Sequence, residues 1–345
     1  MSVQNPPYSL KMPDVTIIIV NYNGKEFLPE CLSCLERQTF RNFDVVVVDN
    51  GSTDGSLEEL GRFLQGRLLR NRVRTLSLRS NTGFTGGNIE GMRYCKGEYV
   101  ALLNNDTEAD ERWLEELVKA MDAAPEVGIC ASKMIAYGTD LIDSAGDGFA
   151  TLLKGFKTGE GEKEQGYNQP GYVFGACAGA ALYRRAMIRE IGFLDEDFFL
   201  IHEDADLNFR AQLSGWKVMY VPSAIVYHKV RSSIGHMSDT AVYYTLRNSE
   251  FVRIKNIPCG VFLRCLPAFA LGMVTEFIFF AIKHRKFRIY CRAKKDALVM
   301  LPGMFKKRKT IMKSRVVSNE YLFGSMSSVF AAGFLKTKLR KFFHG

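Results

Sequence analysis

A short apolar run, Val100-Ala-Leu-Leu103, stops abruptly at Asn104-Asn105-Asp106, and this boundary constrains the fold more than any other stretch. An apolar run of this length, bounded by turn formers, is typical of a buried parallel strand. Open α/β sheets bind their ligands where such strands end. A carboxylate beside amide oxygens suits a hard divalent cation that also contacts phosphates. Asp106 is therefore a candidate metal ligand, although these residues are equally typical of a turn that begins the next helix.

Two earlier β-branched runs end in the same way. Residues 13–20 lead into Asn21-Tyr22-Asn23-Gly24, and residues 43–48 lead into Asp49 and a cluster of turn formers. Between them, apolar side chains recur at helical spacing over residues 25–38, which predicts a strand–helix–strand unit with a right-handed crossover. Asp49 could accept a hydrogen bond from a pyrimidine N–H or a ribose hydroxyl, or it could close an Asx turn.

A glycine-rich stretch, Asn81-x-Gly-Phe-x-Gly86-Gly-Asn88, follows a predicted strand at residues 73–78. Three glycines within five residues let the backbone approach a ligand closely, and the two asparagines offer donors and acceptors. Dinucleotide-binding folds place such glycines directly after the first strand, where this chain has Asn-Tyr-Asn-Gly instead. The sequence therefore argues against a nicotinamide dehydrogenase.

The same alternation of strands and helices continues to about residue 230. Further strands are expected at residues 98–103, 127–135, 216–221 and 225–228, and helices at residues 89–95, 113–121 and 203–214. Residues 140–169 are rich in Gly, Glu and Lys without a period, which predicts a long loop of the kind that often forms a functional lid. The small residues at 173–183 would admit a sugar-sized ligand or pack densely in a core.

Charge divides the chain near residue 250. Residues 251–345 carry 20 Lys and Arg against 3 Asp and Glu, a net +17, whereas residues 1–250 carry 26 against 34, a net −8. A basic segment of this size favours an anionic partner, either phospholipid or nucleic acid. The apolar residues interleaved with this charge argue against nucleic acid.

Residues 257–282 are almost wholly apolar, but Arg264, Pro267 and Glu276 interrupt them. A spanning helix prefers about 20 uninterrupted apolar residues. We therefore expect in-plane or re-entrant helices on an anionic bilayer, with a second such element at residues 321–335. The alternative is a helical dimerisation domain, since an exposed apolar patch can also mark a protein partner.

The eight cysteines are scattered along the chain, and no signal peptide is apparent at the N-terminus, so we expect a reduced cytoplasmic setting. Cys31 and Cys34 form a Cys-x-x-Cys pair, but both fall in a predicted helix and no second pair accompanies them. Ordinary helix packing is therefore favoured over a zinc or redox site.

Seven short motifs occur in an order that resembles the family 2 glycosyltransferases, most of all their bacterial rhamnosyltransferase-like branch. They are Val-Asn-Tyr-Asn (20–23), Val-Val-Asp-Asn-Gly-Ser-Thr-Asp (47–54), Asn-x-Gly-Phe-x-Gly-Gly-Asn (81–88), Leu-Asn-Asn-Asp (103–106), Gly-Phe-Leu-Asp-Glu-x-Phe-Phe (192–199), His-Glu-Asp (202–204) and Tyr-His (227–228). The resemblance covers roughly residues 13–250 and depends on the whole set, because each motif alone is weak.

The resemblance implies an α/β GT-A fold, a Rossmann-like mixed sheet flanked by helices. It implies inverting transfer of a sugar, such as rhamnose, from a nucleoside-diphosphate-sugar to a cell-surface glycan or lipid-linked acceptor. Asp204 matches the general base, and Asp106 matches the last residue of an Asp-x-Asp motif for Mg²⁺ or Mn²⁺, with Asn104 replacing the first acid. His228 resembles a further metal ligand. The implied nucleotide-binding residues are Asn21, Tyr22, Asn23, Asp49, Asn81, Gly86, Asn88 and Asn105, and the implied acceptor-binding residues are Cys177, Gly179 and Glu203.

Three regions are thus expected: an N-terminal arm at residues 1–12, a GT-A domain at 13–250, and a basic helical region at 251–345. The expected location is peripheral, on the cytoplasmic face of the inner membrane, and the dimerisation reading would make the protein a homodimer. The main alternative function is a non-catalytic relative that binds nucleotide-sugar or glycan. The presence of both Asp106 and Asp204 argues against it, because a binding protein has no need of a base.

Overall fold

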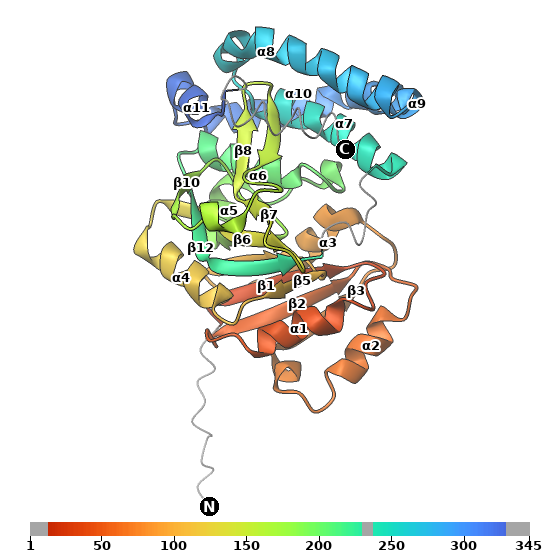
Figure 1. The fold of residues 1–345 in the computed structure, drawn as a ribbon, viewed down its shortest axis with the longest axis vertical. Coiled ribbons are helices and arrows are strands. Elements are labelled where there is room, and N and C mark those ends of the chain that lie inside the picture. The colour runs from red at the N-terminus through yellow and green to blue at the C-terminus, as the bar shows by residue number, and fades with distance from the viewer. Residues whose placement is uncertain (1–12, 230–236, 329–345) are drawn as a thin grey trace, which may run out of the picture.

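The computed structural model describes residues 13–229 and 237–328, which form one mixed sheet with helices on both faces and a further layer of C-terminal helices (Figure 1). The strand order is β10-β12-β6-β11-β4-β1-β2-β3, and β5 and β7 pair with β12 and β6. The strands are β1 (Val15–Asn21), β2 (Phe43–Asp49), β3 (Val73–Ser77), β4 (Tyr99–Leu103), β5 (Thr107–Ala109), β6 (Val127–Ala136), β7 (Ile142–Ala145), β10 (Gly171–Val173), β11 (Ala180–Arg184) and β12 (Lys217–His228).

The strands β4, β1, β2 and β3 run parallel, as the apolar runs predict. Ile17 and Ile19 of β1 enter a core with α1 and α4, whereas Ile18 enters a core on the opposite face with α3, α5 and α6. Burial of both faces explains why these strands read as continuous apolar runs. The helices of this region are α1 (Leu28–Glu36), α2 (Ser56–Phe63), α3 (Gly83–Met92), α4 (Trp113–Ala123), α5 (Arg185–Ile191) and α6 (Glu203–Leu213).

The Cys-x-x-Cys pair lies within α1, and both thiols face the core. Burial raises the pKa of Cys31 and of Cys34, so both thiols stay protonated. The pair therefore packs as ordinary helix residues, in agreement with the interpretation favoured from the sequence.

Residues 140–169 do not form the predicted long loop. They contain β7, which joins the main sheet, and a hairpin of β8 (Asp147–Ala150) and β9 (Lys154–Lys157). These strands are only four residues long, too short to show a period, and pairing with distant residues stabilises them. The hairpin tip approaches the C-terminal helices, because a Cβ placed on Gly272 would lie 3.2 Å from the side chain of Leu152.

Two other elements differ from the prediction. The helix expected at residues 89–95 begins earlier, at Gly83, whose φ of +77° favours glycine. The two strands expected at residues 216–221 and 225–228 form a single strand, β12, with a shift in register between Val221 and Ile225. Such a shift is typical of a bulge, and Pro222 lies within it.

The apolar C-terminal segment is one continuous helical stretch, Cys259–Lys283, which is long and apolar enough to cross a membrane by length and composition. It comprises α8 (Cys259–Phe277) and the π-helix η4 (Ile278–Lys283). The two charged residues and the proline that interrupt the apolar run in sequence do not break the helix. The Arg264 guanidinium lies 3.7 Å from the Phe323 ring centroid, and Glu276 points into the protein.

Glu276 is buried among three cations from three other elements. Its carboxylate lies 3.3 Å from Lys154 of β9, 3.7 Å from Arg253 of α7 (Asp239–Asn256) and 2.8 Å from Lys294 of α9 (Phe287–Val299). Burial alone would raise the pKa of this carboxyl, but the three cations lower it to about 2. The charge that seemed to break the apolar run therefore anchors α8 to the rest of the protein.

The C-terminal helices share a core with the sheet region. Phe149 of β8 and Phe209 of α6 contact each other within a cluster that also holds Ile257, Met304 and Leu322.

The predicted boundary at residue 250 lies inside α7. The second predicted apolar element, residues 321–335, begins within α11 (Asn319–Ser325), and residues 329–335 lie outside the described part of the chain. Between α9 and α11 lies α10 (Leu301–Lys313), and the described residues also include the short 3-10 helices η1 (Leu68–Arg72), η2 (Glu164–Gly166) and η3 (Glu196–Phe198).

Candidate functional site

The carboxyl ends of β1, β2 and β4 meet at one edge of the sheet, where amide and carboxylate side chains bond to one another. Asn21 Nδ2 donates to Asp49 Oδ1 at 3.2 Å, and Asn105 Nδ2 donates to Asn21 Oδ1 at 2.8 Å. The Ser52 backbone N–H donates to Asp49 Oδ2 at 3.2 Å, so Asp49 also holds the loop that follows it. These three predicted residues therefore lie together, and the network fixes their orientation.

The other predicted nucleotide-binding residues flank this edge. The side chains of Asn23 and Asn81 accept backbone N–H groups of Thr53 and Gly83, each at 2.8 Å, and so fix two loops. Tyr22 is 46% exposed beside them. A Cβ on Gly86 would lie 2.6 Å from the Thr82 side chain. Asn88 is buried, as Asn21 and Asp49 are, but its side chain donates to the Phe84 carbonyl within α3 rather than to the network at the sheet edge.

Asp106 and His228 lie together beside the sheet edge, in a chain of charged side chains. His228 Nε2 lies 3.3 Å from Asp106 Oδ1, and His228 Nδ1 lies 2.9 Å from Asp143 Oδ2. Lys157 donates to both oxygens of Asp143, at 2.9 and 2.8 Å. Pairing of β5 with β12 places Thr107 opposite His228, which brings Asp106 into contact. Asp143 and Lys157 were not predicted, because both lie in the segment expected to be a loop.

Asp106 and His228 have the donor atoms to bind a divalent cation whose coordination is completed by substrate phosphates. Within residues 13–229 and 237–328, no group of three or more His, Cys, Asp or Glu side chains is placed to hold a metal ion. Magnesium sites with one or two protein ligands and substrate phosphates are common, and a carboxylate on the second nitrogen of a ligating histidine orients the ring. Burial opposes protonation of His228, but the two carboxylates raise its pKa to about 9. Metal binding would therefore displace a proton.

A second group of acids lies at the start of α6. Asp204 Oδ1 accepts the Ala205 N–H at 2.7 Å, and Asp204 Oδ2 accepts the Ala178 N–H at 3.4 Å. Burial raises the pKa of Asp204 above its ordinary value. Asp147 of β8, which was not predicted, has its pKa raised by burial and by the charge of Asp204. A carboxylate with a raised pKa is a better proton acceptor than an exposed one.

The segment from Cys177 to Gly179 connects the two acidic groups. Its Ala178 N–H binds Asp204, and the Gly179 carbonyl accepts the Asn104 N–H at 2.8 Å. A Cβ on Gly179 would lie 3.2 Å from the Asn104 side-chain amide, so a larger residue would require that side chain to shift. One short segment therefore contacts both the base candidate and the loop that carries the metal-ligand candidate.

Glu203 is buried, and its Oε2 has no hydrogen-bond partner among the described residues. Burial, and then the charge of Asp204, raise its pKa from 4.5 to about 8. The folded state thus binds this proton more tightly than the unfolded chain does. The contribution of Glu203 to the free energy of unfolding is therefore fully present below pH 4.5 and is lost as the pH rises through about 8.

We therefore expect Glu203→Gln to stabilise the protein at high pH. Its advantage over the parent in free energy of unfolding should grow by about 1–4 kcal/mol from pH 5 to pH 9. Denaturant unfolding at several pH values measures this difference. Glu111→Gln, which changes an exposed carboxylate, is the control. A pH-independent difference between Glu203→Gln and the parent would show that Glu203 is ionised in the folded state.

The family model described as "Glycosyl transferase family 2" matches residues 16–192, just over half of the chain. The chain belongs to this family. The match includes the sheet edge and Asp106, whereas Asp204 and His228 lie beyond it. The family prediction made from the seven motifs is therefore confirmed.

Relatives and solved structures agree with this assignment. Glycosyltransferase GlyG of Streptococcus pneumoniae is 31% identical over 117 residues, which cover 33% of this chain and 38% of GlyG. The N-acetylglucosaminyl-diphospho-decaprenol L-rhamnosyltransferase of Mycobacterium tuberculosis is 26% identical over 273 residues, which cover 70% of this chain and 88% of that protein. The structure of mannosyltransferase PcManGT from Pyrobaculum calidifontis, in complex with GDP-Man and Mn²⁺, superposes with a TM-score of 0.53 at 16% identity, covering 95% and 89% of the two chains. The structural likeness confirms the GT-A fold.

Proposed function

We propose that this family 2 glycosyltransferase inverts the anomeric carbon as it moves a sugar, such as rhamnose, from a nucleoside-diphosphate-sugar to a hydroxyl of a glycan or lipid-linked acceptor. One observation carries the proposal: the segment from Cys177 to Gly179 contacts both Asp204 and the loop that carries Asp106, which pairs with His228. A donor diphosphate and an acceptor hydroxyl need opposite sides of one sugar. This arrangement supplies a group for each.

Asp204 is the proposed general base. As the acceptor oxygen attacks the anomeric carbon, Asp204 takes its proton, and the bond from that carbon to the diphosphate oxygen breaks on the opposite face. A single displacement of this kind inverts the anomeric centre. Cys177, Gly179 and Glu203 border the acceptor side of the site in this proposal. General base catalysis of this kind typically contributes about 10²–10⁴ in rate.

Asp106 and His228 are the proposed ligands of Mg²⁺ or Mn²⁺. When bound, the cation would offset the negative charge that develops on the leaving diphosphate. Asp143 holds His228 Nδ1, so that Nε2 faces Asp106, and Lys157 holds Asp143 in turn. These two supporting residues fix the ligand geometry before the donor binds.

The nucleotide is proposed to bind along the edge formed by β1 and β2. There, Asp49 would accept from the base or ribose, and the backbone at Gly86 would approach the diphosphate closely. The residues assigned to the nucleotide are Asn21, Tyr22, Asn23, Asp49, Asn81, Gly86 and Asn105. Asn88 supports α3 from within.

The test is a panel of nucleoside-diphosphate-sugars, incubated with the full chain and Mn²⁺ or Mg²⁺. Release of the nucleoside diphosphate, measured with and without chelator, identifies the donor. We expect release from one donor class and none after chelation. Binding of a donor without release, in the presence of the candidate acceptors, would favour the non-catalytic alternative. Undiminished release in excess chelator would contradict the metal assignment.

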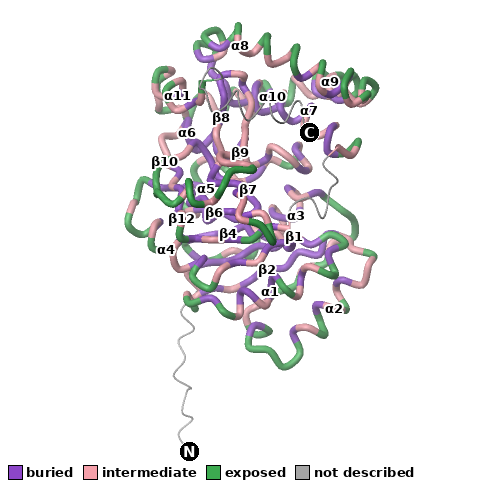
Figure 2. The backbone as a smooth tube through the Cα atoms, viewed as in Figure 1, coloured by how far each residue is buried: buried purple, intermediate pink, exposed green. Residues whose placement is uncertain are grey.

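The exposed face of α8 and η4 is proposed to lie on the cytoplasmic face of an anionic membrane. Figure 2 shows these helices at one end of the molecule, with exposed residues along them. Leu263 is 66% exposed, and the apolar face continues along the same helical side. The other exposed apolar residues of this face are Leu266, Leu271, Val274, Ile278 and Ile282. With a net +17 in residues 251–345, an anionic bilayer matches both the apolar face and the charge.

Vesicle binding should therefore depend on this face. Replacing Leu271 and Val274 together by glutamate should weaken co-sedimentation with anionic vesicles by about 10- to 100-fold, because it removes two side chains that would enter the bilayer. Leu68→Glu, at an exposed position in the short 3-10 helix η1 (Leu68–Arg72) of the sheet region, is the matched control. High salt should weaken binding without eliminating it. Absence of co-sedimentation, together with a concentration-dependent dimer, would favour the dimerisation alternative.

A further inference from the structure

The residues directly before α6 have an unusual backbone. Phe199, Ile201 and His202 have φ angles of +63°, +66° and +71°. This region favours glycine, and a β-branched residue there is a clear outlier. Each such residue costs about 1–3 kcal/mol and persists only where its surroundings enforce it. We call residues 197–202 the pre-helix segment.

A tight turn adds to the strain of this segment. The Leu200 N–H donates to the Phe198 carbonyl at 2.7 Å, and Phe199 between them has φ 63° and ψ −59°. This geometry is that of the γ-turn with positive φ, which is rare and strained. The segment therefore needs partners that fix its carbonyl groups.

Two consecutive residues of α7 supply these partners, and the residue after them holds a side chain of the segment. Asn248, with no exposed surface, donates from Nδ2 to the carbonyls of Phe198, Leu200 and Ile201 at 2.9, 2.7 and 2.7 Å. Arg247 Nη2 donates to the carbonyls of Asp197 and Phe198 at 2.7 and 3.2 Å. We call Arg247, Asn248 and Ser249 the α7 clamp.

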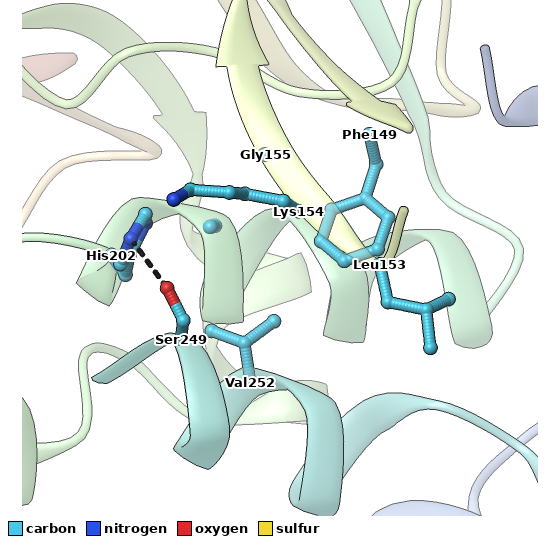
Figure 3. Close-up of a pocket in the computed structure, with 8 residues that line it drawn as sticks. Phe149, Leu153, Lys154, Gly155, His202, Ser249 and Val252 are labelled. Carbon is cyan, nitrogen blue, oxygen red and sulfur yellow. Dashed lines mark hydrogen bonds between the residues drawn. The ribbon is translucent and has the colours of Figure 1, made fainter. Parts of the chain in front are cut away.

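The third residue of the α7 clamp holds the side chain of His202. Ser249 Oγ donates to the Thr245 carbonyl at 2.7 Å and lies 3.1 Å from His202 Nε2, so it accepts the Nε2 proton. Figure 3 shows this bond beside a small cavity that Lys154 also lines. Burial, and then the charges of Lys154 and Arg253, lower the pKa of His202 to about 3. The ring is therefore neutral, and this bond assigns its proton to Nε2.

The pre-helix segment determines where the proposed base lies. His202 is the residue directly before α6, and its carbonyl accepts the first helical bond, from the Asp206 N–H at 3.0 Å. Asp204 stands in that first turn. At the other end, the Phe199 carbonyl accepts the Thr85 N–H of α3 at 3.0 Å. The segment thus joins the glycine-rich helix to the helix that carries the base.

We propose that the α7 clamp is a set of positioning residues for sugar transfer, which hold the pre-helix segment in a strained conformation and thereby orient Asp204. The inference depends on the proposed function, because it concerns the base of that reaction. None of the three residues needs to touch substrate. A purely structural role would lower stability and the folded fraction, whereas a positioning role lowers turnover in enzyme that is folded.

The test combines loss and rescue. Asn248→Ala removes both donors, and we expect it to lower kcat for transfer by about 10- to 100-fold in folded enzyme, with the donor KM changed less than about threefold. Ile201→Gly, combined with Asn248→Ala, allows the positive φ without the clamp. The kcat of the double variant should therefore be at least about fivefold higher than that of Asn248→Ala alone. The effect of Ile201→Gly in the parent is measured separately and subtracted, as in a double-mutant cycle.

The matched control is Arg184→Ala. Like Asn248, Arg184 donates to three backbone carbonyls, those of Met121, Ala124 and Val127, but on the far side of the sheet from Asp204. The Arg184→Ala substitution should lower the thermal midpoint of unfolding and leave kcat per folded enzyme unchanged. Should Asn248→Ala fail to fold, Arg247→Lys and Ser249→Ala take its place, each with an expected loss of at least about threefold in kcat and little change in donor KM.

Two results would overturn the proposal. One is an unchanged kcat in folded Asn248→Ala, or in both substitute variants. The other is a loss that Ile201→Gly does not relieve, because the loss would then not arise from the strained backbone. Asp204→Asn is measured in the same series. If that variant retains transfer, the base assignment fails; if it loses transfer while the clamp variants retain it, only the clamp inference fails.

Discussion

Asp204→Asn is expected to lose sugar transfer by a factor of about 10²–10⁴ while it still binds donor. The amide has the shape of the carboxylate and can still accept one backbone N–H, but it cannot take a proton from the acceptor. The two bonds of Asp204 to Ala205 and Ala178 involve no nucleotide-binding residue. Turnover with acceptor measures the loss, and calorimetric titration with donor measures the binding that remains.

The control for this variant is Asp44→Asn, which makes the same chemical change near the start of β2, at the opposite end of the strand from Asp49. It should retain turnover. Near-normal transfer by folded Asp204→Asn would mean that another group accepts the proton. Asp147 would be the next carboxylate to test, because it lies close enough to Asp204 for the charge of Asp204 to raise the pKa of Asp147.

Asp106→Ala is expected to weaken binding of the nucleoside diphosphate by about 10- to 100-fold and to change binding of the free nucleoside less than about threefold. The reason is that the diphosphate would be held through the cation, whereas the nucleoside contacts the edge of β1 and β2. Titrations of both ligands, with and without Mn²⁺, measure the difference. In the variant, Mn²⁺ should no longer improve diphosphate binding.

Asp110→Ala separates this role from that of a simple turn. Asp110 accepts the Arg112 N–H at 3.0 Å in the turn that begins α4, and its loss should change stability only. Equal losses of diphosphate binding in Asp106→Ala and Asp110→Ala would support the turn interpretation of this segment. A loss confined to Asp106→Ala supports the metal interpretation.

The sheet edge could be predicted because its features are local in sequence. Each apolar run and its polar end, such as that at Asp49 or Asp106, are adjacent, and parallel strands bring such ends together. Asp143 could not be predicted as a partner of His228, since 85 residues separate them and β7 has too few residues to show a period. Its position depends on long-range pairing with β6.

The α7 clamp illustrates a second limit. Nothing in the propensity of Ile201 or His202 suggests a positive φ, and local rules fail most often where function or strain overrides them. Asn248 lies about 50 residues further along the chain from the carbonyls it holds. Glu276 is similar: in the sequence it interrupts an apolar run, and only the fold places three cations around it.

The ion pairs of Glu276 also fix the position of α8 relative to the proposed site. Through Lys154, α8 is joined to the β8–β9 hairpin, and the same hairpin carries Lys157, which holds Asp143 beneath the proposed metal ligands. A protein resting on α8 would therefore present Asp204 at one fixed height above the surface. Acceptors whose hydroxyl group lies nearer to the membrane, or farther from it, would not reach the base. The packing of α8, the β8–β9 hairpin and the sheet would then select acceptors by the distance between the membrane and the reacting hydroxyl.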